Sequence, residues 1–124
     1  MTAEEIAIAA AQAAVGKRAN DVIVLKLRGL TIVTDFFVIA SAEAAVQVRA
    51  VVEAIQERLH ALGRRCLSRE GWEDARWVLL DYGDVVVHVF RQPDREYYEL
   101  ERLWGDAERI DVPAVAEGLP QRSP

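Results

Sequence analysis

Two apolar runs separated by a single glycine constrain the fold of this chain more than any other feature. The runs, 76–82 and 84–90, are rich in β-branched and aromatic residues and flank Gly83. Because glycine is favoured where a tight turn needs a positive φ angle, the pattern predicts a β-hairpin. Side chains alternate along a strand, so two sets face opposite ways: Trp77, Leu79 and Asp81 on one side, and Val78, Leu80 and Tyr82 on the other. We expect the second, more apolar set to face the core.

Further segments alternate between helix and strand patterns. Thr2 and Glu5 form a capping-box pattern, which predicts a helix over 2–17. Apolar residues at helical spacing, followed by Gly63, predict a second long helix over 43–62. Three more strands and a short final helix are expected: strands at 20–28, 35–41 and, more weakly, 64–70, and a helix after Pro93 with Asp94 as its cap.

These elements predict a single α/β domain. A chain of 124 residues suits one domain, and two long helices with about five strands favour a mixed five-stranded sheet over a doubly wound parallel sheet. The helices would cover one sheet face and leave the other exposed or used for binding. We expect the domain to span 1–111, and residues 112–124, with their prolines and small side chains, to form a disordered tail.

The charge balance excludes some classes of partner. The chain has 15 Lys and Arg against 20 Asp and Glu, a net charge of −5, so it has little long-range attraction for nucleic acid or anionic lipid. We expect no direct high-affinity nucleic acid contact and no membrane partner.

The one cysteine, Cys66, cannot form an internal disulfide, and we see no secretory leader pattern and no metal-type cysteine pair. The expectation is a cytoplasmic protein without a cofactor.

Most of the negative charge lies in residues 93–111. This segment has seven acidic and three basic side chains, a net −4, interleaved with Tyr97, Tyr98 and Trp104. Aromatic side chains beside charged ones are typical of protein-binding hot spots. A solvated helix whose aromatic side chains pack inward is an equally weighted alternative. Trp77 and Leu79 on the outer sheet face would add an apolar patch, which usually marks a partner surface.

The sequence favours structural roles for two titratable side chains, His88 and Cys66. His88 shares its strand face with Val86 and Phe90, so we expect it to be partly buried or to face a partner. No nearby nucleophile or carboxylate is paired with it in the sequence, which weakens a general-base role. Nothing local predicts a lowered pKa for Cys66, and we expect a structural thiol.

Carboxylates near strand ends allow one enzymatic hypothesis. Asp81 and Asp84 flank the hairpin turn and could hold a divalent metal, although Asp is also favoured in turns for its local hydrogen bonds. Asp35, before an apolar strand, could equally cap the loop 31–34. The motifs for phosphate cradling, zinc hydrolysis and a nucleophile elbow are absent from the sequence. The alternative is therefore a metal-dependent nucleotidyl or phosphoryl transferase that uses these three scattered residues.

Four stretches resemble the ribosomal silencing factor family, also called Iojap. They are NDVIVLKLRGL, TDFFVIAS, GWEDARWVLLDYGDVVVHVF and YYELERLWGDA. The resemblance implies a translation regulator that is not an enzyme, binds the large ribosomal subunit at its protein fourteen and sterically blocks joining of the small subunit when nutrients are scarce. It also implies a homodimer when free, and a fold similar to the nucleotidyltransferases. Their Gly-Ser turn and Asp-x-Asp pair are absent here, so their catalysis is not carried over.

The family's binding surface maps onto the hairpin and the acidic segment. The residues expected to contact the ribosomal protein are Trp77, Leu79, Asp81, Tyr98, Glu99, Glu101 and Trp104, with Arg76 and His88 as secondary candidates. The chain departs from the family pattern at residues 41–46, which lack the usual glycine and polar caps. We expect Ser41 to remain as the N-cap of the second long helix.

Overall fold

A computed structural model describes residues 1–113. The expected tail, 112–124, lies almost entirely outside these residues. Its first two members contact the domain: Val112 packs against the core, and the Pro113 carbonyl accepts a hydrogen bond from Gln12 Nε2 at 2.9 Å. None of the helices described is long and apolar enough to cross a membrane.

The two long helices form as predicted. Helix α1 spans Ala3–Gly16 and begins with the full capping box, because the Thr2 hydroxyl accepts from the Glu5 amide and the Glu5 carboxylate accepts from the Thr2 amide. Helix α2 spans Ala45–Ala61. The expectation that Ser41 caps α2 is wrong. The N-cap is Ala44, without a side-chain hydrogen bond, and Ser41 lies earlier, inside a strand.

The sheet has six strands, one more than expected. Their bounds are β1 Asn20–Lys26, β2 Phe36–Ala42, β3 Ser68–Glu70, β4 Trp77–Asp81, β5 Val85–Arg91 and β6 Glu108–Ile110. Their order in the sheet is β3-β4-β5-β2-β1-β6, and β2–β5 is the only parallel pair within residues 1–113. The sheet is therefore mixed, as predicted, and the hairpin around Gly83 is β4–β5. Strand β6 has only three residues and no apolar alternation, so no local pattern predicts it.

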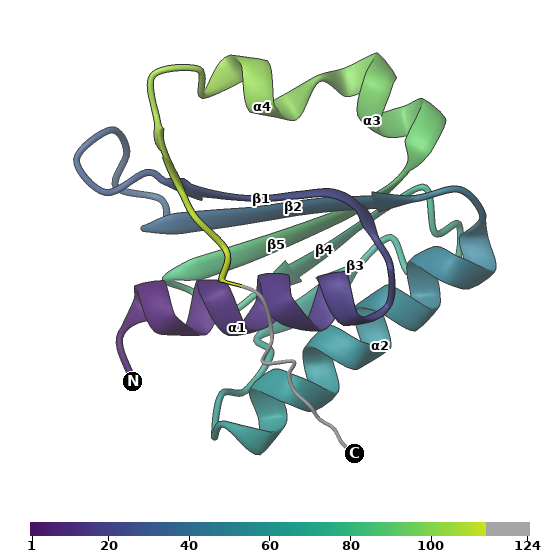
Figure 1. Ribbon diagram of the computed structural model, residues 1–124, viewed down its shortest axis with the longest axis horizontal. Coiled ribbons are helices and arrows are strands. Elements are labelled where there is room, and N and C mark those ends of the chain that lie inside the picture. The colour runs from purple at the N-terminus through teal and green to yellow at the C-terminus, as the bar shows by residue number, and fades with distance from the viewer. Residues whose placement is uncertain (114–124) are drawn as a thin grey trace.

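Helices α1 and α2 cover one face of the sheet and bury the main core against it (Figure 1). Alanines of α1 and the apolar stripe of α2 pack against β-branched residues of the central strands. The buried residues of α2 are those expected from the helical spacing, Val48, Val51, Val52, Ile55 and Leu59. From the hairpin, Val78, Leu80 and Tyr82 face this core, as expected, and Trp77 and Leu79 face the other side.

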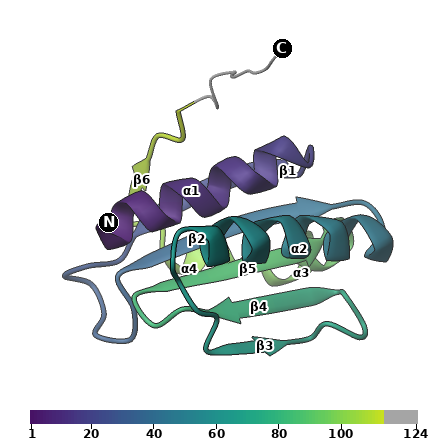
Figure 2. The ribbon, with the colours of Figure 1, turned by 90° about the horizontal axis from the view of Figure 1, so that it is seen from below.

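The opposite face is not bare, which corrects the expectation of a sheet covered on one side. Helices α3, Gln92–Tyr98, and α4, Leu100–Leu103, pack over it, and Figure 2 shows β3 and β4 lying to one side of them. Under these helices is a second apolar cluster, whose fully buried members are Leu25, Leu27, Ile39 and Phe90. The two helices are short and rich in charge, so their apolar side gave only a weak pattern.

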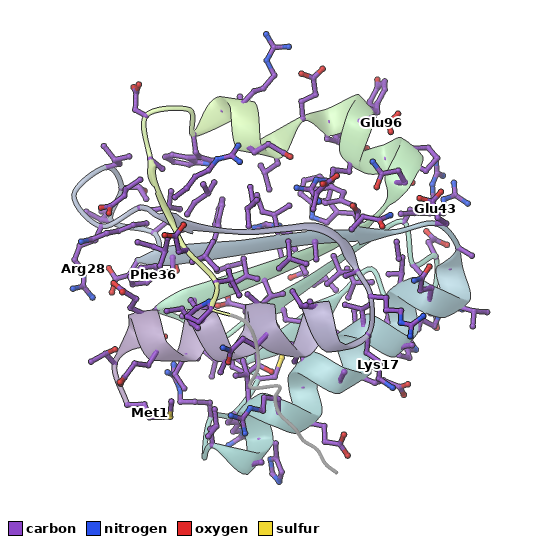
Figure 3. The ribbon with its side chains drawn as sticks, in the orientation of Figure 1. Met1, Lys17, Arg28, Phe36, Glu43 and Glu96 are labelled. Atoms are coloured by element: carbon purple, nitrogen blue, oxygen red, sulfur yellow. The ribbon has the colours of Figure 1, made fainter. Side chains whose placement is uncertain are left out.

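Helix α3 begins earlier than predicted. Its N-cap is Arg91, not Asp94, and Pro93 lies in its first turn, where the missing amide hydrogen costs nothing. Figure 3 shows which residues lie at the two ends of the sheet. Arg28 and Phe36 lie at one end, beside the β1–β2 loop. Glu43 and Glu96 lie at the other end, where α2 and α3 begin.

Candidate functional site

An aromatic row runs between the hairpin and the short helices. We define it by Trp77, His88, Phe90 and Tyr98. The Trp77 ring lies 4.8 Å from that of Phe90 and 4.9 Å from that of Tyr98, centroid to centroid. Phe90 is fully buried, Trp77 is half-buried, and Tyr98 is 49% exposed. The row therefore leads from the second apolar cluster to solvent.

His88 holds Trp77 in place. The Trp77 indole donates a hydrogen bond from Nε1 to His88 Nδ1 at 3.1 Å, so the neutral ring carries its proton on Nε2. His88 is 4% exposed and meets the edge of Phe37, with ring centroids 4.5 Å apart. Burial lowers the pKa of His88 to about 4, because charging the ring there would cost its hydration. The imidazole is thus a neutral acceptor that orients Trp77.

The exposed side of the row is continued by the hairpin. Leu79 is half-buried on β4, directly opposite His88. The Asp81 carboxylate accepts a hydrogen bond from the Gly83 amide at 2.8 Å and so fastens the turn, which is the local role typical of Asp there. Leu79 and Asp81 therefore lie beside the aromatic row on the part of the sheet that α3 and α4 leave open.

The corner between α3 and α4 presents Tyr98 and Glu99. Glu99 has a φ angle of 48°, in the left-handed region, and this breaks the helix between Tyr98 and Leu100. The Glu99 carboxylate pairs with Arg102 at 2.6 Å in an exposed position. Tyr97, 80% exposed, stands edge-on to Tyr98 with ring centroids 5.0 Å apart. Two tyrosines and a carboxylate thus meet solvent at one corner.

Trp104 faces the sheet instead. It is half-buried against the second apolar cluster and meets the edge of Phe37, with ring centroids 5.9 Å apart. Both interpretations of the acidic segment therefore have support. Trp104 packs inward, as a solvated helix requires, and the two tyrosines point outward, as a docking surface requires.

Charged residues fasten α3 to the hairpin. Arg76, 63% exposed in its side chain, lies 3.4 Å from Asp94, and Arg91 lies 3.4 Å from the same carboxylate. Asp94 is buried, so its negative charge is balanced by two arginines from either side. Arg76 therefore links the start of β4 to α3.

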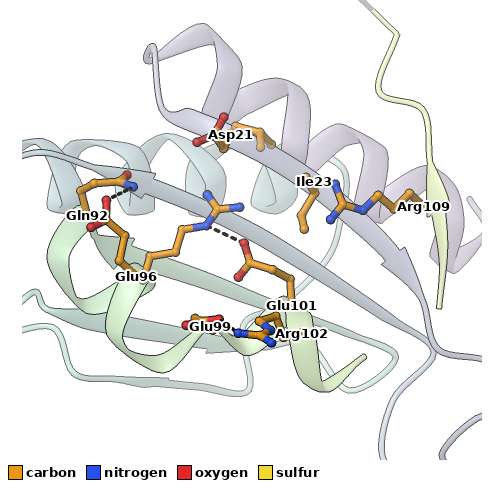
Figure 4. Close-up of a pocket in the computed structure, with 10 residues that line it drawn as sticks. Asp21, Ile23, Gln92, Glu96, Glu99, Glu101, Arg102 and Arg109 are labelled. Carbon is orange, nitrogen blue, oxygen red and sulfur yellow. Dashed lines mark hydrogen bonds and ion pairs between the residues drawn. The ribbon is translucent and has the colours of Figure 1, made fainter. Parts of the chain in front are cut away.

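A polar network that sequence reasoning missed lies beneath α3. Arg95, 6% exposed, donates from Nε to Glu101 at 3.0 Å and from Nη1 to the Asn20 carbonyl at 3.1 Å and to Ser41 Oγ at 3.0 Å. Asn20 and Ser41 are 75 and 54 residues from Arg95 in the chain, so no spacing pattern connects them to it. Around the network is an open cavity of about 550 Å³, bordered on its far side by Asp21, Ile23 and Arg109 (Figure 4).

The three carboxylates of the transferase hypothesis are each engaged elsewhere. Asp35 pairs with Arg28 at 3.3 Å, Asp84 pairs with Arg64 at 2.6 Å, and Asp81 fastens the hairpin turn. Within the described residues no group of three His, Cys, Asp or Glu side chains is placed to hold a metal ion. Among residues 1–113, these three carboxylates therefore have structural partners and do not form the shared donor set of a two-metal site.

Comparison of the sequence with known proteins gives one matching family and several relatives. Residues 1–123 match the family described as "Ribosomal silencing factor during starvation". A ribosomal silencing factor from Bacillus subtilis is 42% identical over 112 residues, which cover 90% of this chain and 95% of that protein. A mouse protein named "Mitochondrial assembly of ribosomal large subunit protein 1" is 31% identical over 91 residues, which cover 71% of this chain and 40% of that protein.

Solved structures show the same fold. The crystal structure of a protein from Chromobacterium violaceum has a TM-score of 0.82 at 33% identity and covers 95% of this chain and 98% of that one. One from Bacillus halodurans has a TM-score of 0.77 at 37% identity and covers 88% and 99%. The resemblance seen in the four sequence stretches is confirmed by the family match and the named relatives. The chain belongs to the ribosomal silencing factor family.

Proposed function

We propose that this protein represses translation by docking on the large ribosomal subunit, at its protein fourteen, and sterically preventing the small subunit from joining. It would act without catalysis, in the cytoplasm, and lower protein synthesis when nutrients are limited. The free form would be a homodimer. The observation that carries the proposal is the aromatic row, which ends in a half-exposed Tyr98 beside the carboxylate of Glu99.

The chemistry of this surface suits a basic ribosomal protein. Tyrosine and tryptophan supply a large contact area with few rotatable bonds, and they dominate binding energy at protein interfaces. Residues 93–111 carry most of the chain's net negative charge, which would steer the protein towards a basic partner embedded in RNA. The proposed contact residues are Trp77, Leu79, Asp81, Tyr98, Glu99, Glu101 and Trp104, with Arg76 and His88 as secondary ones.

The names of relatives support the same direction. The family description refers to ribosomal silencing and starvation, and the mouse relative's name refers to the large ribosomal subunit. A domain of this size, bound on the face between the subunits, would block the small subunit sterically. It would need no catalytic reaction to do so.

Gradient sedimentation tests the proposal in two steps. Purified large subunits are first mixed with the protein, which is expected to co-sediment with them and not with small subunits. Small subunits are then added, and the yield of joined ribosomes is expected to fall as the protein is titrated. Failure to co-sediment at low salt would overturn the docking, and unchanged joining at saturation would overturn the exclusion.

A further inference from the structure

Helices α3 and α4 are too short to hold their own shape. They have seven and four residues, and isolated helices below about 12–15 residues are marginal in water. Yet they carry Tyr98 and Glu99, which the proposed docking requires in a defined orientation. Contacts with the rest of the molecule must therefore fix their corner.

The guanidinium of Arg95 provides those contacts. It bonds to the Asn20 carbonyl at the start of β1, to Ser41 Oγ on β2 and to Glu101 on α4, while Arg95 itself belongs to α3. One buried side chain thus joins two strands and both short helices. Ser41, fully buried, also donates to Gln92 Oε1 at 2.7 Å and so ties down the first residue of α3.

The ion pair between Arg95 and Glu101 depends on the bend between the helices. On a continuous α-helix, residues six apart point in different directions, because one turn takes 3.6 residues. The left-handed Glu99 breaks the helix between them and lets the two side chains meet at 3.0 Å. The Glu99 amide also donates to the Arg95 carbonyl at 2.9 Å. The bend and the pair therefore stabilise each other.

The two acids at this corner have different surroundings. Glu99 pairs only with exposed Arg102, whereas Glu101 Oε2 accepts from Arg95 and Glu101 Oε1 is buried with no hydrogen-bond partner among the described residues. Figure 4 shows Glu101 turned towards the cavity between α4 and β1, and Glu99 beside Arg102. A carboxylate held in this way is poorly placed to meet a basic side chain of a partner.

We propose that Arg95 and Glu101 are positioning residues: their ion pair, between a buried guanidinium and a carboxylate that is 24% exposed, sets the α3–α4 corner so that Tyr98 lies against Trp77 in the geometry that docks. This rests on the proposed function and revises the role of one proposed contact residue, because Glu101 acts through Arg95 and Tyr98 instead of touching the partner. In some systems ion pairs withdrawn from solvent contribute conformational specificity more than stability, and the proposal assigns that role to this pair.

Measurements on the free protein test the positioning itself. Glu101→Ala is expected to speed hydrogen exchange of the Glu99 and Arg102 amides at least tenfold and to weaken the near-ultraviolet circular dichroism of the aromatic row. Exchange in α1 and α2 should be unchanged. Glu101→Gln keeps an oxygen that accepts from Arg95 and should restore the spectrum. Glu99→Ala would change the bend itself, so the matched control is Arg102→Gln, which breaks the exposed pair alone and should leave the spectrum intact.

Binding to purified large subunits tests the consequence. Glu101→Ala should raise the Kd at least tenfold without changing its salt dependence, because no contact charge is lost. In a double-mutant cycle, Glu101→Ala should raise the Kd less than threefold when Tyr98 is already alanine, since both act through the same ring. Glu101→Gln should bind within threefold of the wild type.

Clear results would overturn the proposal. If Glu101→Ala leaves exchange and circular dichroism unchanged, the pair does not position the corner. If Glu101→Gln binds as poorly as Glu101→Ala and both flatten the salt dependence, Glu101 is a direct contact. If the wild type itself fails to bind large subunits, the proposed function falls, together with any docking role for the corner, while the exchange data still decide whether the pair orders it.

Discussion

At the scale of single residues, the aromatic row depends on polar atoms placed behind it. Trp77 is oriented by an imidazole that must stay neutral, and Tyr98 rests on Trp77. His88 has no hydrogen-bond partner for Nε2 within residues 1–113, so a charged ring would leave a buried, uncompensated cation there. The orientation of the proposed docking surface is therefore linked to the protonation state of one histidine.

This linkage predicts a pH dependence of stability. The folded pKa of His88, about 4, lies below the ordinary value of 6.5, so the unfolded chain binds the proton more readily. Stability is then fully present above pH 6.5 and is lost as the pH falls towards 4, by roughly 2–3 kcal/mol for this group. Urea unfolding from pH 4 to 7 measures it. His88→Asn, whose amide oxygen can accept from Trp77, should remove this part of the slope, and His60→Asn, at an exposed position on α2, should keep it. Equal slopes in the wild type and His88→Asn would contradict the assignment.

Tyr98 is the sharper test of the docking surface, because it is half-exposed and its loss leaves the core intact. Tyr98→Ala should weaken binding to large subunits by about 2 kcal/mol, roughly a 30-fold rise in Kd. The matched control is Val46→Ala, an exposed apolar residue on α2, which covers the other sheet face. Titration of labelled protein with large subunits gives both constants. A Tyr98→Ala protein that binds like the wild type would move the interface elsewhere.

At the scale of elements, prediction succeeded where local sequence decides the structure. The capping box at Thr2, the stripe of α2 and the hairpin at Gly83 are local patterns, and all three elements form. The short elements after Pro93 depend on distant contacts instead. Strand β6 exists because β1 offers it a free edge, and α4 exists because Arg95 and the second apolar cluster hold it.

The same difference explains the errors at the candidate site. Ser41 was expected to cap a helix, as its position before α2 suggested, but Arg95 and Gln92 engage it from more than 50 residues away. The aromatic and acidic residues could be selected from strand alternation, from the position of charge along the chain and from the family resemblance. Which of them face solvent could not, because that depends on how α3 bends over the sheet.

The turn before β4 gives an element-scale prediction. Gly71 has a φ angle of 81°, and a Cβ there would lie 2.1 Å from the Trp77 carbonyl oxygen. Gly71→Ala should therefore destabilise the fold by more than about 2 kcal/mol and displace the start of β4. Gly63→Ala is the control, since its φ is also positive, 83°, but the space around it is open. It should cost only about 1 kcal/mol. Urea denaturation compares them, and equal losses would show that the close approach does not matter.

At the scale of the whole molecule, the two long helices and the two short acidic helices lie on opposite faces of the sheet. Helices α1 and α2 cover one sheet face, and the acidic, aromatic helices cover part of the other. Residues 93–111 alone carry −4 of the net −5, spread over α3, α4 and the edge strand β6. Under the proposed function, this concentration of acidic charge would turn the segment towards a basic partner during the encounter.

This segregation predicts that the position of charge matters more than its amount. Removing two exposed acids from the acidic segment 93–111, by Glu96→Gln with Glu108→Gln, should slow association with large subunits several-fold at low salt. Removing two exposed acids from α2, by Glu53→Gln with Glu57→Gln, changes the net charge equally and should have a much smaller effect. Stopped-flow association at two salt concentrations measures this, and the difference should shrink at high salt because the field is screened. Equal slowing by both pairs would mean that net charge alone steers the encounter, and that the acidic helices have no directing role.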